Sequence, residues 1–177
     1  RTTPADPFDQ GAGHIRPGGE WSKGSVTQPG LAYDAGLFEY FGFLCDAFPA
    51  IFVNPTATCA ALASSGIPTK AINLNYPSIG ISQVPGAKTV TRTVTSVAKE
   101  NGVRTYNANV VAPPGYTVTV SPSTLKLKKG QSATFSVTVT NVSAPVGQWR
   151  FGSLTWNEKD GNYTVYSPIA VKAALFE

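Results

Sequence analysis

The sequence predicts a mainly β protein: a seven-stranded β-sandwich, preceded by a Gly/Pro-rich extended segment and a short disulfide-tied helical hairpin. Three observations predict this fold. The last hundred or so residues alternate apolar and polar side chains with a period of two, which is typical of strands with one buried face. Turn-forming residues separate these stretches at regular intervals, as they do in sandwiches. The first 36 residues concentrate glycine and proline, which prevent long regular elements.

The N-terminal segment is expected to have no core of its own. Residues 1–36 contain eleven glycines and prolines and few periodic apolar positions. Such a segment buries too little apolar surface to offset the entropy of ordering it. We therefore expect extended backbone that normally lies against a neighbour.

Two short helices are expected next. Apolar side chains of residues 37–48 fall on one helical stripe, and Asp34 is placed to cap the start. A second helix fits residues 56–64, because Pro55 suits a first turn and Gly66 suits an end. The stripe consists of Leu37, Tyr40, Phe41, Leu44 and Phe48.

The two cysteines, Cys45 and Cys59, then lie on facing helices. No second Cys or His pair is present to complete a metal cage, so a disulfide is expected, with two buried free thiols as the alternative. The bridge would stabilise this segment by about 3 kcal/mol in the loop-entropy model. A disulfide also indicates an oxidising compartment, of which the extracellular space is one. The sequence contains no signal peptide and no apolar run of membrane length, so membrane insertion is not expected and the N-terminus of a secreted parent is expected to lie elsewhere.

From about residue 73 the hydrophobic period changes from helical to two. Arg92 disturbs the pattern, since it stands on the same face as Val90 and Val94. Either a bulge re-aims this side chain, or its charge lies at a sheet edge or an interface. The expected strands are 74–82, 88–97, 104–112, 116–121, 131–140, 148–157 and 162–172.

Charge divides the chain in two. Residues 1–70 contain four basic and six acidic residues, whereas residues 71–177 contain ten basic and four acidic ones. Because such a step often marks a boundary, two domains, 1–70 and 71–177, are expected. The lysines at 126, 128 and 129 are interpreted as a solvated turn. Nucleic acid is not an expected partner, and an anionic cell surface is a better one.

Seven phrases occur in a fixed order and carry a family resemblance. They are GAGHIRP (11–17), GLAYD (30–34), FLC (43–45), LNYPSI (74–79), TVTRTVTSV (89–97), FGSLTW (151–156) and YSPIAV (166–171). Together they resemble the C-terminal part of a secreted subtilisin-like serine protease of the large plant and bacterial type. The resemblance implies that residues 1–70 are the end of the catalytic domain with a helical linker, and that residues 71–177 form a fibronectin type III-like sandwich. It also implies the catalytic domain of the same protease as partner, with a homodimer as a further contact.

The segments that carry subtilase catalysis are absent from the sequence. No Asp-Thr-Gly or Asp-Ser-Gly, no His-Gly-Thr-His and no Gly-Thr-Ser occurs, and serine chemistry needs acid, base and nucleophile together. The chain is therefore expected to be a non-catalytic region with no catalytic residue. The alternatives are an autonomous adhesion or glycan-binding module, or a hydrolase built around His14, the single histidine. His14 is instead expected to pack the glycine-rich segment.

No cofactor is expected, and no metal. The spacing of Asp6, Asp9, Asp34 and Asp46 matches no metal loop. Asn141 and Asn162 begin glycosylation sequons, which apply if the source is eukaryotic.

Aromatic residues are concentrated on the last two expected strands. Phe151 shares a face with Trp149, whereas Trp156 points the other way. Most of this group is expected in the sandwich core, with an interface as the alternative. The group consists of Trp149, Phe151, Trp156, Tyr163 and Tyr166.

Overall fold

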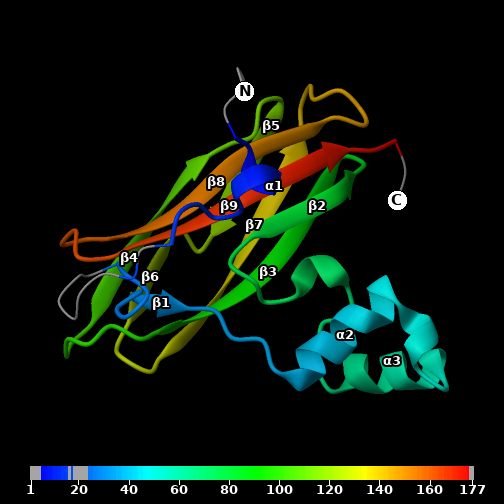
Figure 1. The fold of residues 1–177 in the computed structure, drawn as a ribbon, viewed down its shortest axis with the longest axis horizontal. Coiled ribbons are helices and arrows are strands. Elements are labelled where there is room, and N and C mark those ends of the chain that lie inside the picture. Colours follow the sequence, from blue (N-terminus) through cyan, green and yellow to red (C-terminus); the bar gives the residue numbers. More distant parts are fainter. Residues whose placement is uncertain (1–4, 16, 18–23, 176–177) are drawn as a thin grey trace.

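Two β-sheets face each other, and a helical hairpin projects from one end of them (Figure 1). The architecture comes from a computed structural model that describes residues 5–15, 17 and 24–175. One sheet has the order β1-β3-β7-β5: Leu31–Ala32, Ala87–Ser96, Ser132–Asn141 and Tyr116–Ser121. The other has the order β2-β9-β8-β4-β6: Ile79–Val84, Thr164–Ala173, Trp149–Glu158, Arg104–Val111 and Thr124–Leu127. Neighbouring strands are antiparallel except β2 and β9, which run parallel.

The core lies between the two sheets and follows from the period-two pattern. In β3 the inward side chains Val90 and Val94 are fully buried, and so are Val137 and Val139 on β7. Across the sheets, Phe135 of β7 contacts Trp156 of β8, and their ring centroids lie 5.0 Å apart in an edge-to-face arrangement. Burial of these side chains supplies the main driving force for closing the sandwich.

The expected sandwich is confirmed, but the number of strands is larger than seven. Every expected strand occurs with boundaries shifted by a few residues at most, and β1 and β6 are additional. The largest shift is in β2, which begins at Ile79 because residues 71–73 form a short 3₁₀ helix, η2, followed by a turn. Lys126 lies within β6, so the expectation of a turn was wrong for this residue and holds for Lys129.

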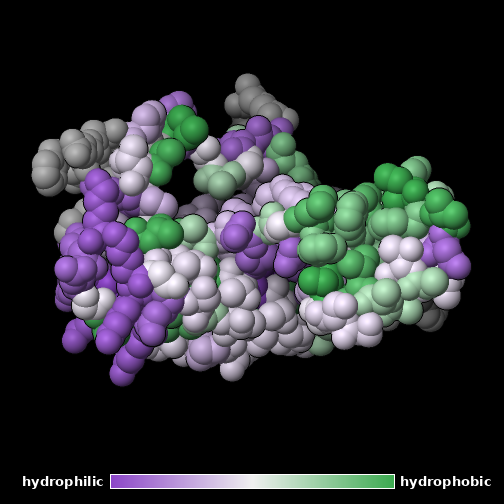
Figure 2. All heavy atoms as spheres, turned by 90° about the horizontal axis from the view of Figure 1, so that it is seen from below, coloured by the Kyte–Doolittle hydropathy of each residue, from purple (hydrophilic) through white to green (hydrophobic). Residues whose placement is uncertain are grey.

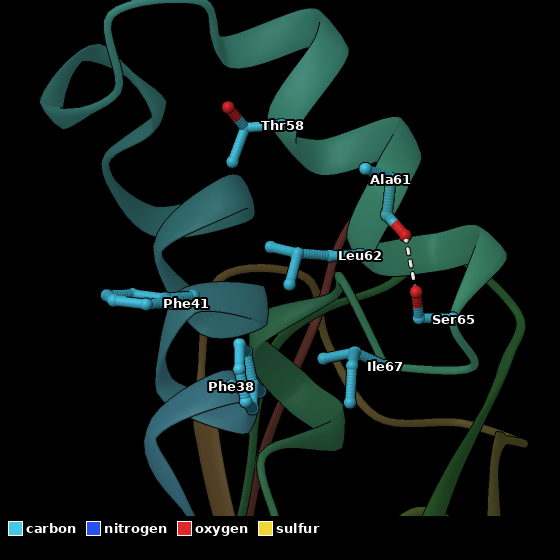
Figure 3. Close-up of a pocket in the computed structure, with 7 residues that line it drawn as sticks. All are labelled: Phe38, Phe41, Thr58, Ala61, Leu62, Ser65 and Ile67. Atoms are coloured by element: carbon cyan, nitrogen blue, oxygen red, sulfur yellow. Dashed lines mark hydrogen bonds between the residues drawn. The ribbon is translucent and has the colours of Figure 1, made fainter.

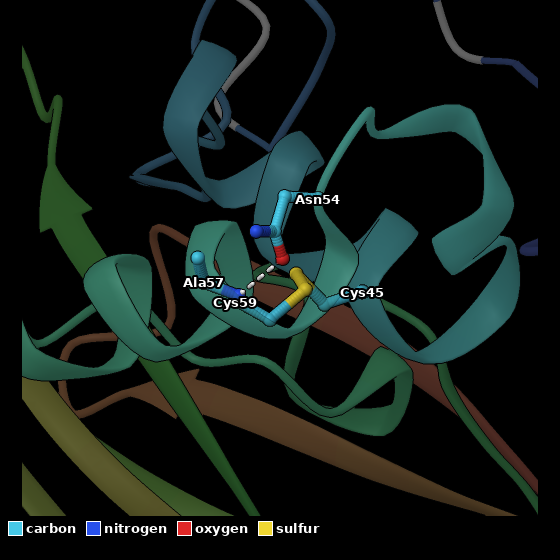
Figure 4. Close-up of a disulfide and its surroundings, with 4 residues drawn as sticks. All are labelled: Cys45, Asn54, Ala57 and Cys59. Carbon is cyan, nitrogen blue, oxygen red and sulfur yellow. Dashed lines mark hydrogen bonds between the residues drawn. A yellow bond between two sulfur atoms is a disulfide. The ribbon is translucent and has the colours of Figure 1, made fainter.

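The helical hairpin consists of α2 (Leu37–Ala47), the 3₁₀ turn η1 (Pro49–Ile51) and α3 (Pro55–Ser64). The expectation that Asp34 caps α2 was wrong. Gly36 is the N-cap, and the Glu39 carboxylate accepts a 3.0 Å hydrogen bond from its N–H. Cys45 and Cys59 form the expected disulfide, just beyond the Asn54 side chain that caps α3 through the Ala57 N–H (Figure 4).

Gly42 lowers the helix propensity of α2 but allows the hairpin to close. It is the buried residue of α2, and a Cβ at this position would clash with the Pro68 carbonyl oxygen. The chain after α3 therefore passes directly over the backbone of α2.

The N-terminal segment departs from the expected extended backbone at α1 (Pro7–Gln10). The local sequence explains this short helix. Asp6 accepts hydrogen bonds from the N–H groups of Phe8 and Asp9, and the Asp9 carboxylate accepts one from the N–H of Asp6. Proline at the first helical position adds a fixed backbone angle. No helix within the described ranges is long and apolar enough to cross a membrane.

Candidate interaction surfaces

The residues considered for chemistry do not come together in a site. His14 is exposed, so the expectation that it packs the glycine-rich segment was wrong. Asp6 and Asp9 cap α1, and Asp46 binds the backbone N–H of Ala71 at 2.9 Å. Within residues 5–15, 17 and 24–175, no group of three or more His, Cys, Asp or Glu side chains could hold a metal ion. Asp6, Asp9 and Asp46 thus have local structural roles.

The helical hairpin exposes a largely apolar surface. Residues 37–67 contain two charged residues, Glu39 and Asp46, and no lysine or arginine. Apolar side chains gather at this end of the molecule, whereas hydrophilic ones gather at the opposite end (Figure 2). The large hydrophobic side chains exposed on the hairpin are Leu37, Phe38, Tyr40, Phe48, Ile51 and Val53. The expected helical stripe is therefore covered only in part.

A groove runs between α2 and α3. Phe38 and Phe41 line it from α2, Ala61 and Leu62 line it from α3, and Ile67 closes it from the following loop (Figure 3). Its volume is about 470 Å³. Thr58 and Ser65 complete the lining, and the Ser65 hydroxyl donates to the Ala61 carbonyl. We call this feature the hairpin groove.

The hairpin is fixed to the segment that follows it. Tyr40 of α2 and Tyr76 share a hydrogen bond of 2.7 Å between their hydroxyl oxygens. Asp46 accepts the Ala71 N–H, and the Lys70 ammonium lies 3.6 Å from the same carboxylate. These contacts hold α2 against residues 70–76, so the hairpin has a defined orientation.

Residues 72–78 are in turn attached to the outer edge of β3, and we call them the anchor segment. Among the described residues, β1 pairs with β3 only at Thr95 and Ser96. Farther along this edge, side chains take the place of a strand. Asn73 accepts the Thr91 N–H at 3.1 Å, and Asn75 accepts the Thr93 N–H at 2.8 Å.

Asn75 is the most fully engaged of these side chains. Its amide nitrogen also donates to the carbonyl oxygens of Thr93 and Asp34, both at 2.8 Å. One amide thus joins the anchor segment, β3 and the chain that leads into α2. This arrangement supplies hydrogen-bond partners to backbone groups of an otherwise open strand edge.

Arg92 holds the anchor segment from its buried side. This contact explains why a charged residue lies on an apolar face of β3. It lies in regular register opposite Phe135, so no bulge re-aims it. The side chain is 4% exposed and donates to the carbonyl oxygens of Ile72, Tyr76 and Ser78 at 2.8–3.2 Å. Burial lowers the pKa of the guanidinium to about 10, so it remains charged at neutral pH. Its charge lies at an interface within the chain.

Sequence reasoning found Arg92 as an anomaly but missed Asn73 and Asn75. The signal for Asn75 was its place in the LNYPSI phrase. No local pattern reveals that a side chain replaces a missing strand, because the partner lies 18 residues away.

The aromatic residues of β8 and β9 divide between the core and the surface. Trp156 and Tyr163 are buried, as expected. Trp149 and Phe151 lie on the outer face, where the ring of Phe8 packs edge-on against both with centroids 4.9 and 5.3 Å apart. For this pair the core expectation was wrong and the alternative of an interface applies.

Two further residues complete this outer face. The Lys172 ammonium lies 5.2 Å from the centre of the Trp149 ring, a cation–π arrangement. Tyr166 is 46% exposed.

A polar cluster occupies the end of the sandwich opposite the hairpin. Glu158 is buried and accepts hydrogen bonds from Arg104 and from the backbone N–H groups of Asp160 and Asn162. Burial raises the pKa of this carboxyl, but the hydrogen bonds from Asn162 and Arg104 outweigh burial and hold the pKa below its usual value. Tyr163 donates a 2.6 Å hydrogen bond to Glu100 at the edge of this cluster.

Both sequon asparagines use their side-chain nitrogens within the fold. The Asn162 amide donates to Glu158 at 3.2 Å, and the Asn141 amide donates to the Ala144 carbonyl at 3.3 Å. Both side chains are partly exposed. Glycosylation at these positions stays a prediction.

Comparison with known proteins identifies relatives of the chain. The fibronectin type-III domain model matches residues 73–171. The chain is 39% identical to "Subtilisin-like serine-protease S" of Lotus japonicus and 37% identical to "CO(2)-response secreted protease" of Arabidopsis thaliana, in both cases over 96% of its length. It covers 21% and 22% of these two proteins. The resemblance to subtilisin-like proteases noted in the sequence is thus confirmed.

Among solved structures, the E. coli chaperone DraB aligns with 57% of this chain and 54% of its own. The identity is 12% and the TM-score 0.43, a likeness too low to support conclusions about function.

Proposed function

The chain belongs to the fibronectin type-III domain family, and from this premise we propose that it is the non-catalytic C-terminal region of an extracellular subtilisin-like serine endopeptidase. Its role in that protein is to pack on the protease domain and stabilise it. Residues 1–70 would be the end of the catalytic domain with its helical linker, and residues 71–177 the fibronectin type III-like domain. The relatives that cover nearly the whole chain are subtilisin-like proteases several times its length, which supports a larger parent.

The observation that carries the proposal is the apolar, nearly uncharged hairpin. Soluble monomers rarely expose large contiguous apolar patches, and such patches mark interaction sites. The hairpin is held in a fixed orientation by a disulfide and by the anchor segment, so its exposed face is a preformed surface. A neighbouring protein surface is the partner that this chemistry fits best.

Proteolytic chemistry belongs to the proposed parent and not to this chain. His14 is exposed, and its sequence neighbourhood offers no acid, base and nucleophile in register. The glycan-binding alternative is not favoured, because Phe8 packs over the Trp149 and Phe151 rings that would form an aromatic platform.

An extracellular location is supported by two features. One relative is named a secreted protease. Cys45 and Cys59 are bonded, as expected in an oxidising compartment. The sequons at Asn141 and Asn162 are compatible with such a location if the source is eukaryotic, and their glycosylation stays a prediction.

The proposal is tested by removing the chain from the natural full-length protein. We expect the shortened protein to lose peptidase activity faster at elevated temperature than the full-length protein, and we expect the isolated chain to hydrolyse no peptide or ester. An unchanged half-life of the shortened protein would contradict the stabilising role. Activity of the isolated chain that disappears in His14→Ala would contradict the non-catalytic assignment.

A further inference from the structure

We propose that the hairpin groove is the docking site for the protease part of the same polypeptide, and that it receives an apolar side chain from that part. This inference rests on the proposed function and names the surface through which it acts. The groove lies between Phe38 and Phe41 on one side and Leu62 on the other (Figure 3). Its volume of about 470 Å³ falls within the range of about 300–1,000 Å³ that is typical of pockets for small organic groups.

The chemistry of the hairpin selects an uncharged partner. Within residues 37–67 there is no cation, so phosphate groups of nucleic acids or anionic lipids gain no attraction there. Glu39 and Asp46 are both engaged, one at the N-cap of α2 and the other with the backbone of residue 71. The surface left for a partner is apolar, with aromatic side chains of the kind that dominate interface energetics.

The distribution of exposed apolar side chains points to the remainder of the polypeptide as the occupant. Of the seventeen large hydrophobic side chains exposed in the described part of the chain, ten precede residue 77. This region lies almost wholly outside the segment that matches the fibronectin type-III domain, residues 73–171. The relatives extend well beyond the match, since the chain covers only 21–22% of their length. In the relatives, the polypeptide outside the aligned region is therefore long enough to cover the corresponding apolar surface.

Docking within one polypeptide needs little intrinsic affinity. A tethered partner is present at an effective concentration that is about millimolar for short linkers. The groove also requires little ordering on binding, because the disulfide ties α2 to α3 and the hydrogen bond between Tyr40 and Tyr76 holds α2 against the anchor segment. These features favour a stable intramolecular contact.

Hydrogen exchange of the hairpin amides tests the proposal. We expect the amides of α2 and α3 to exchange at least tenfold more slowly in the natural full-length protein than in the isolated chain. Phe38→Glu, which places a charge on a side chain that is 60% exposed, should abolish this difference. Val103→Glu is the matched control, because Val103 is 55% exposed but lies on the sandwich, directly before β4. It should leave the difference unchanged.

A second variant guards against loss of folding. Ala61→Phe fills the groove from the exposed side of α3 without adding charge, so the isolated chain should retain its circular dichroism spectrum. In the full-length protein it should remove the protection as Phe38→Glu does.

Several results would overturn the inference. Equal hydrogen exchange of the hairpin amides in the full-length and isolated proteins, with peptidase activity present, would overturn this inference but not the proposed function. Self-association of the isolated chain that Phe38→Glu abolishes would assign the groove to a second copy. Binding of the isolated chain to phosphatidylcholine vesicles would assign it to a membrane surface. A full-length protein without peptidase activity would overturn the proposed function and the inference together.

Discussion

Replacing Asn75 with alanine tests how the anchor segment holds the molecule together. The substitution removes three hydrogen bonds of 2.8 Å each, two of them to the backbone of Thr93 and one to the Asp34 carbonyl. A net contribution of about 0.5–1.5 kcal/mol per hydrogen bond gives a loss of about 1.5–4.5 kcal/mol for the three. Because Thr93 lies at a sheet edge that water can reach after the substitution, we expect the lower part of this range, about 2 kcal/mol.

The loss would be measured by urea unfolding of the chain, followed by tryptophan fluorescence. The midpoint should fall without a change of slope, because the surface exposed on unfolding stays the same. A loss of this size should lower the melting temperature by about 4–8 °C in a chain of this length. Asn109→Ala is the control, because Asn109 is exposed on β4.

Hydrogen exchange localises the effect. The Thr93 amide should lose protection in Asn75→Ala, because its acceptor is the Asn75 side chain. If Asn75→Ala and Asn109→Ala differ by less than about 0.5 kcal/mol, the typical limit of surface substitutions, the anchoring role of Asn75 is refuted.

Three further outcomes are expected. Replacing Cys45 and Cys59 together with serine should cost about 2–3 kcal/mol, from a closed loop of about fifteen residues; the loss should appear as faster exchange in the hairpin, and equal loss of protection throughout the sandwich would contradict a local role. Because folding lowers the pKa of Glu158, its stabilising contribution should be full above the ordinary glutamate pKa of about 4.3 and should disappear as the pH falls through the lower folded value. Glu158→Gln should therefore weaken the dependence of the unfolding free energy on pH below about 4.3. An unchanged acid transition in this variant would contradict the reasoning. Phe8→Ala should increase acrylamide quenching of Trp149 with little loss of stability, since Phe8 is 61% exposed and packs over that ring; unchanged quenching would show that the contact is not maintained in solution.

The sandwich could be predicted from the sequence because its signal is local. Alternation along residues 132–141 fixes which side chains point inward, and the inward ones are buried. The same holds for the two long helices, where Pro55 marks the start of α3 as expected. β6 was missed although its side chains alternate, because a run of four residues is short and its lysine was grouped with Lys128 and Lys129 as a turn.

The contacts that fix the hairpin could not be predicted, because they join distant parts of the chain. The strand pattern does not explain a buried arginine at position 92. The explanation is that residues 72–78 supply carbonyl oxygens around its side chain. Asp34 looks like a helix cap, but the chain between it and α2 is extended, and Gly36 takes the capping position. The hairpin stripe was recognised as apolar, yet its partner could not be located within the chain.

Mapping the site of a serine-directed fluorophosphonate in the natural protein tests the central claim most directly. The natural protein would be labelled, digested and analysed by mass spectrometry. We predict one adduct on a serine outside these 177 residues, in a polypeptide whose mass exceeds the 18.6 kDa of this chain. An adduct on a serine within the 177 residues, or a natural protein that does not react and has the mass of this chain alone, would contradict the account.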